Sequence, residues 1–196
     1  MTTMINRRFG TFRGLVRAAL AYAELATGRL HAFRLRDPAA VNRLVFVCLG
    51  NICRSAYAHQ IALAEGLNVA SLGLSTTTGV ASPAEAVQAA ERSKVPMAQH
   101  RATDFKDFKV QPGDLFLVME VRQAHELRRR LGERDDVQVC LLGMWADPVM
   151  PHLHDPFQQS AEYFDTCFER VRAAVRRLGA QLPNAKAALP AARAQS

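Results

Sequence analysis

The segment that most constrains the fold is a short apolar run that passes through a tight loop directly into a helix. Arg43–Cys48 is rich in β-branched and other apolar residues, which is typical of a buried strand. Leu49–Asn51 contains Gly and Asn, which favour a turn, and a helical pattern then runs from Ser55 until Gly66. A strand, a loop and a helix in immediate succession are half of a parallel βαβ unit.

The same alternation continues along most of the chain. Short apolar runs predict further strands, and periodic segments between them predict helices. The expected strands are Asn68–Leu74, Asp114–Met119 and Val137–Leu142, and the expected helices are Pro83–Lys94, about Val121–Leu131 and a last one that starts after Ser160. Strands separated by helices imply an α/β fold with a parallel sheet covered on both faces.

Length and composition exclude several classes of protein. The 196 residues suit one domain, and the 49% hydrophobic and 22% charged residues exclude disordered and fibrous architectures. The longest apolar stretch near the N-terminus, Ala18–Ala23, is shorter than a membrane span or a signal-peptide core. Four irregularly spaced cysteines do not suit a disulfide scaffold. We therefore expect a reducing, cytoplasmic location.

The net charge of +7 is concentrated at the N-terminus. Residues 1–43 contain eight arginines and two acidic residues, a balance of +6, whereas residues 44–196 contain 17 basic and 16 acidic residues, a balance of +1. An enzyme of nucleic acids would be expected to carry a basic stripe with interleaved aromatic residues on its folded body. The sequence therefore predicts no nucleic-acid partner.

The first 40 residues differ from the rest of the chain. Apolar residues recur there at helical spacing, and charged residues take the other side. The apolar stripe comprises Phe12, Leu15, Val16, Ala19 and Tyr22/Ala23. Our first interpretation is a helix that packs through this stripe on the folded body. The alternatives are weak contact of residues 1–40 with an anionic membrane surface, and a targeting presequence.

The loop after the first strand has the features of a nucleophilic phosphate site. Arg54 follows Cys48 by six residues, at a junction where backbone N–H groups and a helix N-terminus surround a tetrahedral anion. The planar guanidinium of Arg54 can bind two oxygens of that anion. The same positive field favours the thiolate form of Cys48, which makes it a nucleophile directed at the bound phosphorus.

The neighbouring residues agree with this interpretation. Gly50 and Asn51 tolerate the unusual backbone angles of an inward-curling loop, and Ser55 can donate a hydrogen bond to the thiolate. Most free cysteines are simply small buried apolar residues, but that alternative does not explain why these residues occur together. The expected phosphate-binding loop consists of Leu49, Gly50, Asn51, Ile52, Cys53 and Ser55.

Cys48–Ser55, which reads Cys-Leu-Gly-Asn-Ile-Cys-Arg-Ser, resembles the signature of the low-molecular-weight protein tyrosine phosphatases. The resemblance covers about residues 42–182 and implies a four-stranded parallel sheet flanked by helices, with no cofactor. We accordingly expect a phosphatase domain over residues 41–183. The basic amphipathic extension of residues 1–40 precedes it, and an Ala/Pro-rich frayed tail of residues 184–196 follows it.

The resemblance also implies a general acid in an Asp-Pro-aromatic motif shortly before the last helix. Of the three Asp-Pro pairs, only Asp155-Pro156-Phe157 has the aromatic residue and the right distance to that helix, whereas Asp147 reads as a turn residue and Asp37 precedes the nucleophile. Asp155 would protonate the leaving oxygen, a role that contributes roughly 10²–10⁴-fold. Phe157 would be a wall for the substrate ring.

Two further positions match the family by resemblance. Ser71 and His100 lie where the family keeps a serine and a histidine bonded to the loop asparagine, here Asn51, so we expect them to hold the loop in shape.

His152 and His154 form a His-x-His pair beside Asp155, which we interpret as part of a polar loop rather than as a metal site.

The first functional hypothesis is hydrolysis of phosphate monoesters, above all protein phosphotyrosine, through a phosphocysteine on Cys48. Its partner would be a phosphorylated protein, such as a substrate of a tyrosine kinase. A second hypothesis is an arsenate reductase, which needs two more cysteines on a mobile segment, whereas Cys140 and Cys167 fall in an expected strand and helix. A third is a non-catalytic phosphate-binding regulatory module, for which the acid Asp155 would be unnecessary.

Overall fold

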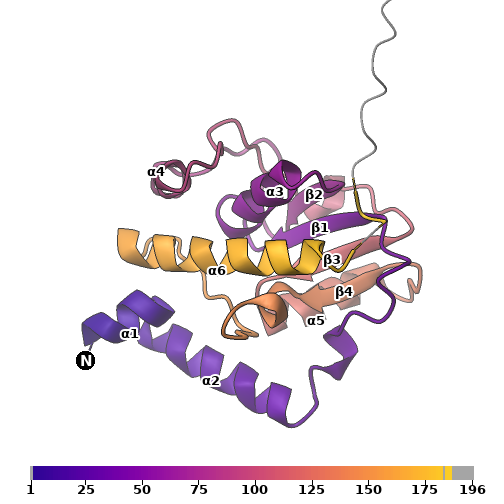
Figure 1. The fold of residues 1–196 in the computed structure, drawn as a ribbon, viewed down its shortest axis with the longest axis horizontal. Helices are drawn as coiled ribbons and strands as arrows, with labels where there is room; N and C mark the ends of the chain where they lie inside the picture. The colour runs from indigo at the N-terminus through magenta and orange to yellow at the C-terminus, as the bar shows by residue number, and fades with distance from the viewer. Residues whose placement is uncertain (1, 183, 187–196) are drawn as a thin grey trace, which may run out of the picture.

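The structure is a computed structural model that describes residues 2–182 and 184–186, with one sheet between layers of helices (Figure 1). Four strands pair in parallel in the order β2-β1-β3-β4. Their bounds are Arg43–Cys48 for β1, Val69–Gly73 for β2, Asp114–Val118 for β3 and Gln138–Leu141 for β4. The predicted four-stranded parallel sheet is confirmed.

The helices of the domain begin and end within a few residues of their expected positions. The α-helices are α1 Thr2–Phe9, α2 Phe12–Ala26, α3 Arg54–Ala64, α4 Ala84–Arg92, α5 Val121–Leu131 and α6 Ala161–Gly179, and the short 3-10 helices are η1 His31–Phe33, η2 Phe105–Asp107 and η3 Leu142–Trp145. Within the described residues, no helix combines the length and the apolar character needed to cross a membrane.

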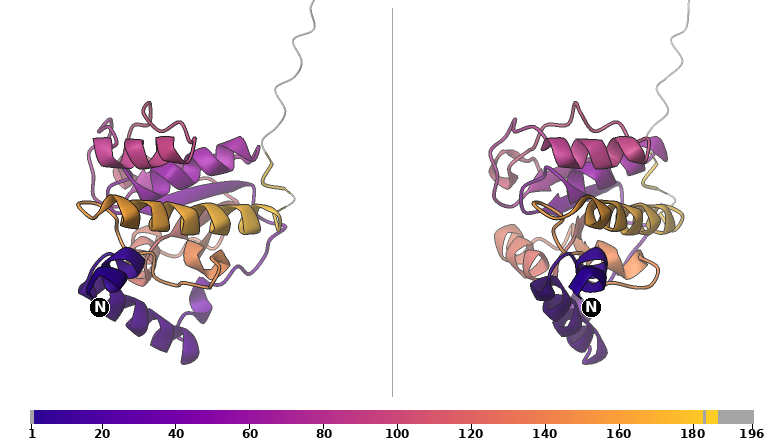
Figure 2. Two further views of the ribbon diagram at one scale, coloured as in Figure 1. Left: turned by 60° about the vertical axis from the view of Figure 1, so that its left-hand side comes forward. Right: turned by 90° about the vertical axis from the view of Figure 1, so that its left-hand side faces the viewer.

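Both faces of the sheet are buried, which explains why β1 reads as a continuous apolar run. Successive side chains of a strand point to opposite faces. Leu44 and Phe46 belong to the core that α3, α4 and α6 share, whereas Val45 and Val47 belong to the core on the side of α5. The two turned views show α6 and α5 on different sides of the strands (Figure 2).

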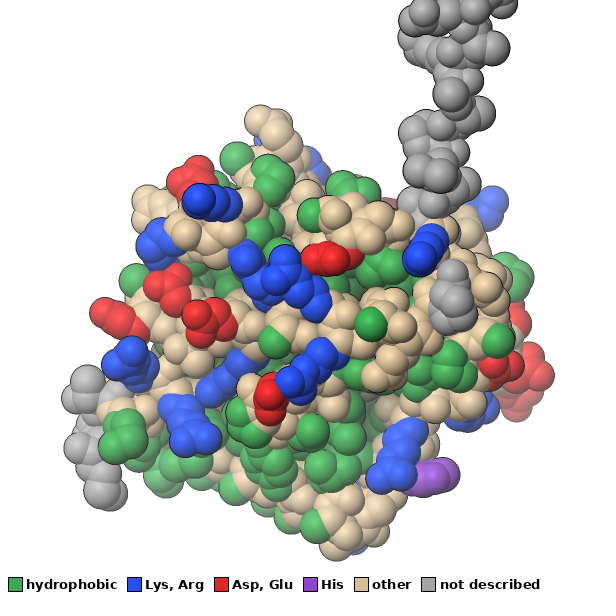
Figure 3. Space-filling model, in the orientation of Figure 1, with side chains coloured by type: hydrophobic (Ala, Val, Ile, Leu, Met, Phe, Trp, Pro, Cys, Tyr) green, Lys and Arg blue, Asp and Glu red, His purple; other side chains and the backbone are tan. Residues whose placement is uncertain are grey.

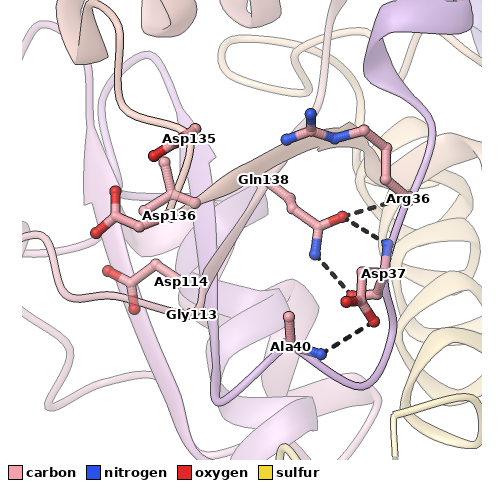
Figure 4. A pocket seen from close by; sticks show the side chains of 9 residues that line it. Arg36, Asp37, Ala40, Gly113, Asp114, Asp135, Asp136 and Gln138 are labelled. Atoms are coloured by element: carbon pink, nitrogen blue, oxygen red, sulfur yellow. Dashed lines mark hydrogen bonds between the residues drawn. The ribbon is translucent and has the colours of Figure 1, made fainter.

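The N-terminal extension is attached to this domain through η1 and the segment after it. Leu30 and Phe33 are buried in the α5-side core, and the Phe33 ring meets the His125 ring edge-on at 4.9 Å. The side chain of Gln138 then fixes the following segment: its Oε1 accepts from the N–H groups of Arg36 and Asp37, and its Nε2 donates to the carbonyl of Asp37 (Figure 4). The extension therefore contributes to the domain core.

Helix α2 packs through the face opposite to the one that its apolar stripe predicts. Its buried residues are Gly14, Ala18 and Ala21, whereas Leu15 is only half-buried. The remaining stripe residues, Phe12, Val16, Ala19, Tyr22 and Ala23, are exposed. Small residues allow the helix backbone to lie close to its neighbours: a Cβ at Gly14 would lie 2.8 Å from the His154 ring, so this face has no room for a larger side chain there. The predicted helix and its packing are confirmed, but the predicted contact face is wrong.

The C-terminal boundary also differs from the prediction. Ala185 is fully buried, its carbonyl accepts from the N–H of Asn68, and Lys186 forms an antiparallel bridge with Leu67. The prediction of a frayed tail from residue 184 is therefore wrong for residues 184–186. The apolar pattern of the sequence did not reveal their packing, because Ala185 is the one buried side chain among them. Residues 187–196 of the expected tail lie outside the described residues.

Two phenylalanines of the extension provide a matched test of its packing. Phe33→Ala removes a ring that is 4% exposed, and we expect it to lower the free energy of unfolding by about 3–5 kcal/mol. Phe12→Ala removes a ring that is 68% exposed, and its effect should stay within about 0.5 kcal/mol. Denaturant unfolding measures both. Equal effects of the two substitutions would contradict the packing described here.

Candidate active site

The candidate site lies at the carboxyl end of β1, where the chain enters α3. A pocket of about 190 Å³ opens there. It is lined by Cys48, Leu49, Gly50, Ile52, Cys53, Ser75, Asp155 and Phe157. The structure thus brings the expected nucleophile, most of the expected phosphate loop, the expected acid and the expected aromatic wall to one cavity.

The loop places the Cys48 thiol among hydrogen-bonding groups. Its Sγ lies 3.0 Å from Ser55 Oγ and accepts from the N–H of Asn51 at 3.2 Å. Within the described residues, the backbone N–H groups of Leu49, Gly50, Ile52 and Cys53 have no acceptor in the protein. Free N–H groups beside a helix N-terminus form an anion-binding concavity. The loop therefore suits a tetrahedral oxyanion held above the thiol.

Asn51 stabilises the conformation of the loop through its hydrogen bonds. Its φ of 53° places it in the left-handed region, as the sequence predicts, whereas Gly50 has no positive φ. The Asn51 amide donates to Ser55 Oγ at 2.9 Å and accepts from the N–H of Thr103 at 2.9 Å. The backbone carbonyl of Asn51 lies 2.8 Å from His100 Nε2. The fully buried Asn51 thus fixes the loop to the domain.

Of the two expected supporting residues, the described part of the chain shows a hydrogen bond to Asn51 from His100 and none from Ser71. Ser71 lies in β2 and is largely buried, but no hydrogen bond joins it to Asn51 among the described residues. The backbone of Thr103 binds the asparagine side chain instead. Sequence reasoning missed this contact because a backbone donor leaves no residue-type signal.

Arg54 is completely buried and lies between two carboxylates. Its Nη1 donates to Glu120 Oε1 at 2.7 Å and to the carbonyl of Leu153 at 2.8 Å, and its Nη2 donates to Asp155 Oδ2 at 2.6 Å. Burial alone would lower the pKa of Arg54, but Asp155 and Glu120 outweigh it and raise that pKa above its ordinary value. The Nε of Arg54 is buried and has no partner within the described residues.

Glu120 is a site residue that sequence reasoning missed. It is fully buried at the start of α5, and its second oxygen accepts from Arg122 Nε at 2.7 Å. Burial would raise its pKa, but the charge of Arg54 holds that pKa at about 2. Its position just after β3, at the sheet edge where β1 ends, was the signal that could have identified it.

Asp155 lies at the mouth of the pocket, on the loop before α6. Its side chain is 34% exposed, and its Oδ1 accepts from the N–H of Phe157 at 3.2 Å. The Phe157 ring is half-exposed at the rim, as expected for a wall that meets a substrate. The carboxyl group can therefore reach both solvent and a molecule bound in the pocket.

His152 and His154 belong to the loop that carries Asp155. Within residues 2–182 and 184–186, no three His, Cys, Asp or Glu side chains come together as metal ligands. The two rings stack with centroids 5.9 Å apart, and His152 is 5% exposed. Burial lowers the pKa of His152 to about 4.

The low pKa of His152 predicts a pH dependence of stability. The ordinary pKa of a histidine is about 6.5, so the unfolded chain binds this proton first, and stability is lost as the pH falls from about 6.5 to about 4. His152→Asn should remove up to about 3 kcal/mol of that loss. Thermal unfolding across this pH range measures it, with His31→Asn, at an exposed position, as the control. An unaltered pH profile in His152→Asn would contradict the burial of a neutral ring.

Comparison with known proteins agrees with this geometry. The sequence model of the low molecular weight phosphotyrosine protein phosphatases matches residues 43–188. The low molecular weight protein-tyrosine-phosphatase Wzb of Salmonella typhi is 28% identical over 152 residues, which are 76% of this chain and 99% of Wzb. The probable phosphatase EpsP of Ralstonia nicotianae is 24% identical over 147 residues, which are 69% of this chain and 92% of EpsP.

Solved structures show the same fold. The tyrosine phosphatase AmsI of Erwinia amylovora superposes with a TM-score of 0.62 at 25% identity, covering 76% of this chain and 98% of AmsI. A YwlE arginine phosphatase with a phosphorylated active-site serine superposes with a TM-score of 0.59 at 25% identity, covering 71% of this chain and 95% of YwlE. The chain is thus a phosphatase that belongs to the low molecular weight phosphotyrosine protein phosphatase family.

Proposed function

We propose that this phosphatase hydrolyses protein phosphotyrosine through a phosphocysteine intermediate on Cys48. The observation that carries the proposal is a single pocket lined by the Cys48 thiol, a loop with free N–H groups and a half-exposed carboxyl group, with the buried guanidinium of Arg54 bonded to that carboxyl group. A protein that only binds phosphate has no use for the carboxyl group. Catalysis of phosphoryl transfer uses all four.

In the first step, the Cys48 thiolate attacks phosphorus and the bond from phosphorus to the leaving oxygen breaks. Protonated Asp155 gives its proton to that oxygen, which leaves as an alcohol or phenol. In the second step, water attacks the phosphocysteine and gives its proton to Asp155. The S–P bond breaks, Cys48 returns to thiolate, and inorganic phosphate is released. Arg54 and the loop N–H groups bind the equatorial oxygens in both steps.

The ion pair between Arg54 and Asp155 supplies a link between binding and proton transfer. Arg54 offers its unpartnered Nε and the adjacent Nη2 to two oxygens of the phosphate. A phosphate bound there displaces the Asp155 carboxylate from Nη2. Asp155 then leaves the ion pair and is available to the leaving oxygen. Substrate binding thereby prepares the acid for the first step.

The pocket favours a phenyl ring over a guanidinium group. Leu49, Ile52 and Phe157 give it apolar walls, and of the described residues that line it only Asp155 carries a carboxylate. A guanidinium substrate would need a carboxylate partner, which Asp155 cannot supply while it acts on the leaving group. We therefore assign phosphotyrosine, the substrate class named for Wzb and AmsI, rather than phosphoarginine, the class named for YwlE.

The positions of the other cysteines disfavour arsenate reduction. Cys140 lies in β4 and Cys167 in α6, both are buried, and burial raises the pKa of each thiol to about 12. A disulfide relay needs accessible, reactive thiols on a segment that moves. Neither cysteine meets that requirement.

A leaving-group series tests the proposal. With aryl phosphates of rising leaving-group pKa, Asp155→Asn should lose roughly 10²–10⁴-fold in kcat/KM on the poorest leaving group and much less on the best. Cys48→Ser should abolish turnover on every substrate while oxyanion binding is kept. Steady-state phosphate release measures both variants. A uniform loss across the series in Asp155→Asn would exclude Asp155 as the acid.

Phosphate release by the wild-type protein from different phosphopeptides tests the substrate class. Matched peptides that carry phosphotyrosine, phosphoserine or phosphoarginine should differ in kcat/KM, with phosphotyrosine the highest. A preference for the phosphoarginine peptide would overturn the assignment of phosphotyrosine as the substrate class. Arsenate reduction without phosphatase activity would overturn the proposed reaction.

A further inference from the structure

The N-terminal extension directly contacts the loop that carries Asp155. His154 precedes Asp155, and its Nε2 lies 3.2 Å from Thr11 Oγ1, just before α2 begins. The same Thr11 oxygen accepts from the N–H of Gly14 at 2.9 Å and so caps the helix. One hydroxyl group therefore fixes both the start of α2 and the imidazole beside the acid.

Two glycines let the extension approach this imidazole closely. A Cβ at Gly10 would lie 2.6 Å from the Tyr163 ring and 2.9 Å from the His154 ring, and a Cβ at Gly14 would lie 2.8 Å from the His154 ring. Gly10 also has a φ of +75°, which disfavours any side chain. From α6, the Tyr163 hydroxyl donates to the carbonyl of His154 at 3.3 Å. His154 is thus held between the extension and α6.

We propose that the extension positions the general acid, with Thr11 as a positioning residue that acts through His154. On the pocket side, Arg54 binds the Leu153 carbonyl and the Asp155 carboxylate. On the opposite side, Thr11 contacts His154, the residue between Leu153 and Asp155. The extension precedes the shared family domain, so this contact is an addition to it. The inference rests on the proposed role of Asp155.

The test uses three substitutions in the full-length protein. Thr11→Val removes the hydroxyl, Thr11→Ser keeps it, and Thr27→Val removes the hydroxyl that bonds the Ala23 carbonyl at the other end of α2, far in sequence from Thr11. We expect Thr11→Val to lose about tenfold in kcat/KM on the poorest leaving group and less than about twofold on the best. Thr11→Ser and Thr27→Val should match the wild type.

The leaving-group dependence separates positioning from mere stability. A less stable enzyme loses the same factor on every substrate, whereas a displaced acid loses most where protonation matters most. A uniform loss or no loss in Thr11→Val would overturn the inference. Asp155→Asn is measured in parallel: a flat profile there overturns the proposed function itself, and a steep profile there with a flat Thr11→Val profile overturns only the role of the extension.

The outer face of α2 carries an independent second observation. Phe12, Val16 and Leu20 lie on the side opposite to Gly14 and Ala18, and they are 68%, 42% and 59% exposed. No charged residue interrupts this face, since Ala19 and Ala23 complete it. Hydrophobic side chains gather over the lower part of the molecule, where Figure 1 places α2 (Figure 3). Helix α2 already packs one face on the domain, and its exposed outer face is also apolar. An exposed apolar face of this kind indicates a second partner.

We infer that this outer face docks on an anionic membrane surface. Exposed arginines precede, interrupt and follow α2 in the sequence: Arg7 and Arg8 at the end of α1, Arg13 within α2, and Arg29 and Arg34 after it. Residues 1–43 carry +6 of the net charge of +7. Apolar side chains that enter the lipid boundary beside arginines that meet acidic headgroups are the pattern of an interfacial helix.

Sedimentation with lipid vesicles tests this second inference. The protein should bind vesicles of equal parts phosphatidylglycerol and phosphatidylcholine, should not bind phosphatidylcholine alone, and should dissociate as salt rises. Phe12→Ser/Leu20→Ser should abolish binding without lowering the melting temperature, whereas Leu63→Ser, at an exposed position on α3, should bind normally. Failure to bind acidic vesicles, or unchanged binding by the double variant, would overturn it. A dimer that the double variant loses would assign the face to a second copy instead.

Discussion

The buried charge of Arg54 is the constraint on which the candidate site depends. A guanidinium removed from water is stable only when carboxylates and carbonyls surround it, and this one binds Glu120, the Leu153 carbonyl and Asp155. These partners come from two separate parts of the chain: Glu120 from the start of α5, and Leu153 and Asp155 from the loop before α6. The requirement to satisfy one cation therefore joins the nucleophile loop, the sheet edge and the acid loop.

The same constraint explains how the site can respond to a substrate. The Arg54–Glu120 contact is fully buried and holds the guanidinium in place, whereas the Arg54–Asp155 contact is partly open to solvent. In the proposed mechanism, a phosphate therefore competes with Asp155 and not with Glu120. Under that proposal, Glu120 has a permanent structural role and Asp155 is available for proton transfer.

Much of this arrangement could be predicted from the sequence, because the loop and the strands have strong local signals. Cys48, Arg54 and their spacing specify a strand, an anion-binding loop and a helix, and the alternation that follows specifies the parallel sheet. Glu120 and the Thr103 backbone could not be identified in this way, because their roles arise from neighbouring elements in space. The packing face of α2 was predicted wrongly because apolar periodicity does not distinguish a face that contacts the domain from one that faces outward. In this helix, the small residues Gly14, Ala18 and Ala21 determine which face packs.

The central claim is that phosphate passes through a covalent bond to Cys48. The stereochemical course at phosphorus tests it most directly, with an aryl phosphorothioate made chiral by two oxygen isotopes and hydrolysed by the wild-type protein in water that carries the third isotope. Two successive displacements, the first by the thiolate and the second by water, each invert the configuration. The account therefore predicts net retention of configuration in the released thiophosphate, and inversion would show direct attack by water and contradict it.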